Sequence, residues 1–118
     1  MYKYSFEKLE IWIVSKELTK RIYSASEGFP KAELYGLRSQ VTRASVSVAS
    51  NIAEGSSRAS KKDQAHFINI AYSSLMEVIN LLYISADLHY IEEGKLTELK
   101  EIILKLSNKL NAFRKSLN

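Results

Sequence analysis

The sequence predicts an all-α protein folded as an up-down-up-down antiparallel four-helix bundle. Apolar residues recur every three or four positions along four long segments, which is the period of a helix buried on one side. The 118 residues include only one proline and four glycines, so few positions break a helix. The breaks gather at three short connections, and helices joined by short connections pack antiparallel. We therefore expect residues 1–118 to form a single domain around one core.

The first two helices are expected over Phe6–Ser26 and Lys31–Glu54. The apolar stripe of the first comprises Ile11, Val14, Leu18, Ile22 and Ala25, and that of the second comprises Leu34, Leu37, Val41, Val48 and Ile52. The Ser-Val-Ser-Val alternation at 45–48 also suits a strand, but a single strand among helices would have no partner. Many small residues in the second helix allow a neighbouring helix to approach closely. Gly55 is expected to end this helix with a positive φ.

The last two helices are expected over Ser60–His89 and Lys95–Leu117. Ser60 and Asp63 have the spacing of a capping box. One apolar stripe of the third helix contains Phe67, Ile70, Ser74, Val78, Leu81, Ser85 and Leu88, and another contains Ile68, Tyr72, Leu75, Ile79, Leu82 and Ala86. A helix that is apolar on two faces has more to bury than its own bundle covers, which predicts self-association. The fourth helix has a strict a/d heptad of Leu96, Leu99, Ile103, Leu106, Leu110, Phe113 and Leu117.

Composition and motifs give no support for an enzyme. The chain has no cysteine, which excludes thiolate chemistry and favours a cytoplasmic location. We find neither a signal-peptide pattern nor an uninterrupted apolar run of about 20 residues, so no membrane association is expected. Asp63 and His66 supply half of a di-metal motif, but His89 has Ala86 at the matching position. The Gly55–Arg58 connection lacks the spacing of a phosphate-binding loop. No catalytic, cofactor-binding or metal-binding residue is predicted, and no cofactor.

Polar residues on facing helices can be paired by their level in the bundle. If the second and third helices turn near residue 57, Arg38 lies level with Glu77. If the first and second turn near Pro30, Arg43 lies level with Glu17. We expect both pairs to be inter-helix ion pairs. Their role would be to fix the register rather than to add net stability, because desolvation offsets much of the attraction.

The middle of the chain resembles a known family. Residues 33–58 follow the pattern E-x-x-G-L-x-S-Q-x-x-R-A-x-x-S-x-x-x-N-I-A-E-G-x-x-R, which is similar to the proteins encoded in intervening sequences of bacterial 23S ribosomal RNA genes. The signature positions here are Arg38, Gln40, Arg43, Asn51, Glu54, Gly55 and Glu77. The resemblance implies a four-helix bundle that assembles as a ring-like homopentamer, without enzymatic activity. It also implies a fold similar to that of basic accessory proteins of diversity-generating retroelements, which work with nucleic acid. By their position, Asn51 and Glu54 are expected to bond to free amides at the start of the third helix.

One end of the predicted bundle is basic. The N-terminus, the 55–62 connection and the C-terminus share this end, which carries eight basic side chains against four acidic ones, whereas the opposite end carries five against seven. In a cyclic ring all subunits point the same way, so their basic ends would merge into one positive rim. The candidate nucleic-acid-binding residues are Arg58, Lys61, Lys62, Lys109, Arg114 and Lys115. The alternative is a scaffold that binds only protein, since cations in a last helical turn also favour the helix dipole.

Overall fold

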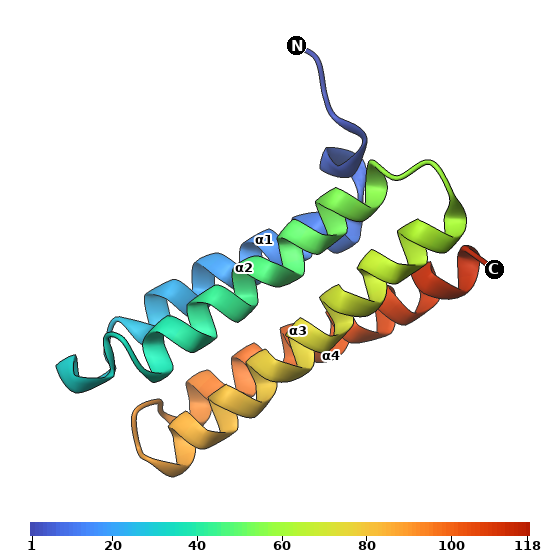
Figure 1. The fold of residues 1–118 in the computed structure, drawn as a ribbon. Coiled ribbons are helices and arrows are strands. Elements are labelled where there is room, and N and C mark those ends of the chain that lie inside the picture. The colour runs from blue at the N-terminus through green and yellow to red at the C-terminus, as the bar shows by residue number, and fades with distance from the viewer.

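The computed structural model describes residues 1–118 as four α-helices and two 3-10 turns. The helices are α1 (Glu10–Ser26), α2 (Leu37–Ser56), α3 (Lys61–Asp87) and α4 (Glu93–Ser116), and the 3-10 turns are η1 (Ser5–Lys8) and η2 (Lys31–Glu33). Successive helices run in opposite directions in Figure 1, and no strand is present. The predicted all-α four-helix bundle is confirmed, and the valine-rich middle of α2 is helical.

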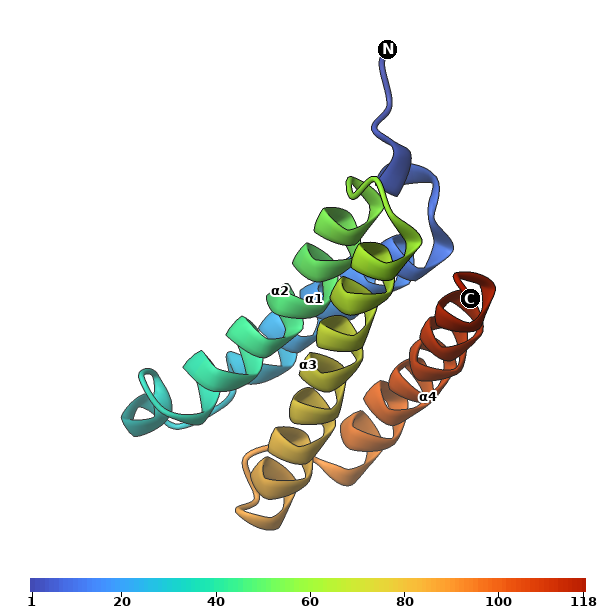
Figure 2. The same ribbon diagram turned by 45° about the vertical axis from the view of Figure 1, so that its right-hand side comes forward.

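Each helix packs against two others. α2 contacts α1 and α3, and α4 contacts α3 and α1, while the diagonal pairs have no Cα atoms within 8 Å of each other. The most extensive contact is between α2 and α3 (Figure 2). Small side chains on α2 account for it, because short side chains let two helix axes come close together. Most of the sequence pattern at residues 33–58 lies on this helix, and its small residues serve packing.

Twenty buried apolar side chains form one continuous core. The heptad of α4 is buried as predicted from Leu96 to Leu110, while Phe113 and Leu117 pack at the edge of the core. From α3 the core takes Ile68, Ala71, Leu75, Val78, Leu81 and Leu82. All of them except Ala71 come from the two predicted stripes, so the buried side of α3 lies between the two stripes. The outer part of each stripe is left at the surface.

Hydrogen bonds allow polar residues to occupy the core. The hydroxyls of Ser15, Ser45 and Ser85 each donate to a carbonyl oxygen of their own helix, at 2.8 Å. Ser47 and Ser74 share a hydrogen bond of 2.9 Å between α2 and α3. A buried hydroxyl without a hydrogen-bond partner would cost free energy. Because these serines are hydrogen-bonded, they can lie where two helices pack closely.

The first two helices begin later than predicted. Residues 5–8 form a 3-10 turn, so α1 starts at Glu10 instead of Phe6. Residues 31–33 form a second 3-10 turn, so α2 starts at Leu37 instead of Lys31. The carboxylate of Glu33 accepts a hydrogen bond of 3.1 Å from the Leu37 amide. This side chain satisfies a free donor at the new helix start, which explains the later boundary.

Gly55 does not end α2. The predicted positive φ is wrong, because no glycine in the chain has one and α2 continues to Ser56. Gly55 is instead buried against α3. A Cβ atom built on it would lie 3.0 Å from Cβ of Phe67 and 3.4 Å from the carbonyl oxygen of Gln64. Close helix packing therefore favours glycine at this position.

α3 has a defined cap at each end. The Ser60 hydroxyl accepts a hydrogen bond of 3.1 Å from the Asp63 amide, which confirms the predicted N-cap. α3 ends two residues before the predicted boundary, because His89 takes a left-handed φ of 63°. The Tyr90 amide then donates to the Ser85 carbonyl at 2.8 Å. This is a Schellman motif in which histidine occupies the position that glycine usually holds.

α3 is long and apolar enough to cross a membrane by length and composition alone, although the sequence predicts no membrane association. The core helix of a soluble protein passes the same test. Seven α3 residues are buried, and the helix packs against both α2 and α4. Its apolar character is therefore explained by the core together with a surface groove, described below.

Candidate nucleic-acid interface

The two termini and the α2–α3 connection lie at one end of the bundle, as Figure 1 shows. An ion pair of 3.0 Å between Lys109 and Glu10 joins α4 to the start of α1. A hydrogen bond of 2.9 Å from Arg114 to Asn69 joins α4 to the first half of α3. The candidate residues Arg58, Lys61, Lys62, Lys109, Arg114 and Lys115 thus gather at this end, which we call the basic end.

Most cations of the basic end have no acidic partner. Lys61, Lys62 and Lys115 are exposed, and no carboxylate oxygen lies within 4 Å of their amines. Lys109 differs, because its pair with Glu10 offsets its charge. We therefore expect Lys109 to attract phosphate less strongly than the three free lysines do.

Arg58 and Arg114 are held by aromatic rings and neutral amides. Cζ of Arg58 lies 4.5 Å from the centroid of the Phe67 ring. Cζ of Arg114 lies 5.7 Å from the centroid of the Tyr72 ring. Neither arginine forms an ion pair with a carboxylate. No carboxylate therefore offsets the charge of either guanidinium group, while contacts with rings on α3 restrict the movement of both side chains.

Several cations at the opposite end are paired. Glu98 accepts hydrogen bonds from Lys95, at 3.0 Å, and from Arg21. These bonds and the charge of Lys95 hold the pKa of Glu98 below its usual value. Glu17 also pairs with Arg21 at 3.4 Å and with Lys20 at 3.6 Å. Charges are thus partly cancelled here, which sharpens the contrast with the basic end.

Neither predicted inter-helix ion pair forms. Glu17 pairs with two cations one turn along α1 instead of with Arg43. Arg38 does not reach Glu77, and its Nε atom is buried without a hydrogen-bond partner. Position along the chain gives the level of a residue in the bundle. Two residues at the same level meet only if both side chains point into the same interface.

A shallow polar depression of about 380 Å³ lies between α2 and α3. It is lined by Tyr35, Ser39, Gln40, Arg43, Ala44, Ser47, Ser74 and Glu77. The family signature thus contributes three surface residues here, namely Gln40, Arg43 and Glu77.

The prediction that Asn51 and Glu54, near the C-terminal end of α2, bond to free amides of α3 is wrong. Asn51 donates to the Ser47 carbonyl at 2.8 Å within α2, and the Glu54 side chain makes no hydrogen bond.

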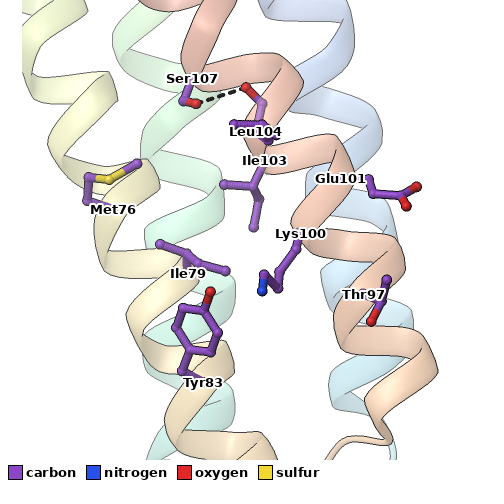
Figure 3. A pocket seen from close by; sticks show the side chains of 9 residues that line it. All are labelled: Met76, Ile79, Tyr83, Thr97, Lys100, Glu101, Ile103, Leu104 and Ser107. Atoms are coloured by element: carbon purple, nitrogen blue, oxygen red, sulfur yellow. Dashed lines mark hydrogen bonds between the residues drawn. The ribbon is translucent and has the colours of Figure 1, made fainter.

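An apolar groove of about 370 Å³ separates α3 from α4 (Figure 3). Its lining residues are Met76, Ile79, Tyr83, Thr97, Lys100, Glu101, Ile103, Leu104 and Ser107. Leu104 is 63% exposed and Tyr83 is 44% exposed. Of the second apolar stripe predicted for α3, Ile79 lines this groove, whereas Ile68, Leu75 and Leu82 are buried in the core. Uncovered apolar surface of this kind marks an interaction site.

The two histidines lie apart, and no cluster of metal-binding side chains is present. The structure contains no group of three or more His, Cys, Asp or Glu side chains that could hold a metal ion. His66 and His89 are both exposed, near opposite ends of α3, and neither side chain makes a hydrogen bond. A histidine base must lie within hydrogen-bond reach of the nucleophile that it activates. Neither histidine meets this requirement here.

These features define a small helical-bundle protein with one basic end and an apolar side groove. A family model described as 23S rRNA-intervening sequence protein matches residues 7–112, and the chain belongs to this family. Its fold is similar to the crystal structure of a protein with unknown function from the S23 ribosomal protein family of Bacteroides thetaiotaomicron. The two share 20% identity with a TM-score of 0.80, over 89% of this chain and 98% of that chain. No curated protein matches this sequence.

Proposed function

We propose that this protein is a non-enzymatic cytoplasmic homopentamer that binds nucleic acid through its basic end. The observation that carries the proposal is the exposed group of Lys61, Lys62 and Lys115, which no carboxylate neutralises. Basic side chains that replace counterions on phosphates supply most of the sequence-independent affinity for nucleic acid. The number of subunits rests on the family resemblance, and the location on the absence of cysteine.

A ring would strengthen binding beyond what one subunit provides. The net charge of one chain is only +4, which is modest for a nucleic-acid-binding protein. A cyclic assembly presents the same end of every subunit on the same side. The free cations of neighbouring subunits would then act on one nucleic-acid chain together, and their potentials would add.

A salt titration of RNA binding tests this function. Lys61→Glu combined with Lys62→Glu should weaken binding and make the dependence of log K on log salt shallower by about 1.4, if two single-strand phosphate contacts are lost. Lys20→Glu combined with Lys31→Glu is the matched control, since it changes the net charge equally at the opposite end. Loss of affinity in both variants alike, or no binding by the wild type at low salt, would refute the proposal.

A protein scaffold is the second candidate function, and the groove between α3 and α4 favours it. Replacing Leu104 by aspartate places a charge in this groove, whereas Asn108→Asp places the same charge on the exposed side of α4. We expect light scattering to show that only Leu104→Asp shifts the oligomer toward the monomer. A wild-type protein that is monomeric at micromolar concentration would contradict self-association. A co-purified partner protein that stays bound at high salt would instead support the scaffold.

A further inference from the structure

The proposed nucleic-acid function leaves open which form of nucleic acid is bound. Resting on that function, we propose that the basic end binds a single strand whose bases stack on the guanidinium groups of Arg58 and Arg114. Both side chains are held in place, and the surface of α3 between them is exposed.

Arg58 presents a preformed stacking surface. Its guanidinium group lies over the Phe67 ring, with Cζ 4.5 Å from the ring centroid. The backbone is fixed as well, because the Gln64 side-chain amide donates to the Arg58 carbonyl at 2.9 Å. Arg58 is nevertheless exposed to solvent. Nucleic-acid bases stack on guanidinium planes as they do on aromatic rings, and only unstacked bases are free to do so.

Arg114 is fixed in orientation without losing its charge. Its Nη1 atom donates to Oδ1 of Asn69 at 2.9 Å, and its Nη2 atom donates to Oδ1 of Asn111 at 2.7 Å. Both bonds run in the plane of the guanidinium group and therefore set the direction of that plane. The acceptors are neutral amides, in contrast to the Glu98 carboxylate that pairs with Arg21. Arg114 can thus attract a phosphate or stack with a base.

The two arginines flank an exposed ridge on the first half of α3. Lys62, His66, Asn69 and Ser73 follow each other by four, three and four residues and are all exposed. They therefore form one continuous face about 16 Å long. The ridge offers a cation, a ring and an amide to a strand that crosses it. The apolar groove begins further along the helix, at Met76.

A double helix would use this surface poorly. Its bases are stacked on each other, so a protein that contacts only its backbone needs cations but no stacking planes. Lysine provides such a charge as well as arginine does, whereas only arginine provides a planar group. The arrangement of Arg58 and Arg114 on rings therefore favours single strands.

The test measures fluorescence anisotropy with three labelled probes of equal length, roughly 12 nucleotides. The probes are a single-stranded RNA, its duplex and an abasic strand that carries the same phosphates. Wild-type protein should bind the single strand about tenfold more tightly than the abasic strand. Because this comparison uses only wild-type protein, it does not depend on the folding of any variant.

Arg58→Lys combined with Arg114→Lys keeps the charge and removes both planes. Affinity for the single strand should fall by about threefold to tenfold, while the salt dependence and the duplex affinity stay unchanged. Arg21→Lys at the opposite end is the control and should have no effect. Equal binding of the single and abasic strands, or a silent double variant, would overturn the stacking inference alone. Failure to bind any probe at low salt would overturn the nucleic-acid function itself.

Discussion

Replacing Gly55 by alanine sets helix propensity against close packing. In an exposed helix this change stabilises by about 0.8–1.0 kcal/mol, because alanine is the better helix former. Here the new Cβ would lie 3.0 Å from Cβ of Phe67 and 3.4 Å from the Gln64 carbonyl oxygen. Both atoms are fixed to the α3 backbone, so the helices must move apart. Overpacking of this kind costs roughly 1–3 kcal/mol, and we expect a net loss of about 1 kcal/mol.

Urea unfolding gives the free energy of unfolding and thermal melting gives Tm, both followed by circular dichroism at one fixed protein concentration. A net loss of 1 kcal/mol should lower Tm by about 4 °C in a domain of this size. Gly94→Ala is the matched control, because no atom lies within 4 Å of the added Cβ and the residue also lies in a helix. It should leave stability unchanged or raise it. If Gly55→Ala were as stable as Gly94→Ala, the close contact would not be the reason for the glycine.

Three further changes test the caps and the charges. His89→Gly should raise Tm, since a left-handed non-glycine residue costs roughly 1–2 kcal/mol, and thermal melting measures the gain. Ser60→Ala should lower the free energy of unfolding by about 1 kcal/mol in urea, because the Asp63 amide loses its acceptor. The pKa of Glu98 is lowered by Lys95 and Arg21, so its contribution to stability is present above the usual glutamate pKa and is lost as pH falls through the lowered value. Glu98→Gln should therefore flatten the dependence of Tm on pH in the acidic range, and an unchanged profile would show that these bonds add nothing.

Part of the candidate site followed from the sequence. The alternation of helices places residues 55–62 beside both termini, so the basic end could be predicted from chain order. Its internal organisation could not be predicted in this way. The pairing of Lys109 with Glu10 and the asparagine bonds of Arg114 depend on which α4 side chains face α1 and α3. The sequence did point to the two aromatic rings, since Phe67 and Tyr72 belong to the apolar stripes predicted for the third helix. In the structure Arg58 lies over Phe67 and Arg114 over Tyr72.

Sequence alone determined the helices, the core and the charge polarity of this protein. These properties are set by local spacing: a period of three to four residues marks the buried side of a helix, and the length of each connection sets the direction of the next. Only the tertiary structure decided why Gly55 is glycine, which ion pairs form and which apolar face stays open. Those properties depend on the rotation of each helix about its own axis and on the separation of axes. Both are fixed by side-chain packing across the whole bundle, which no single segment encodes.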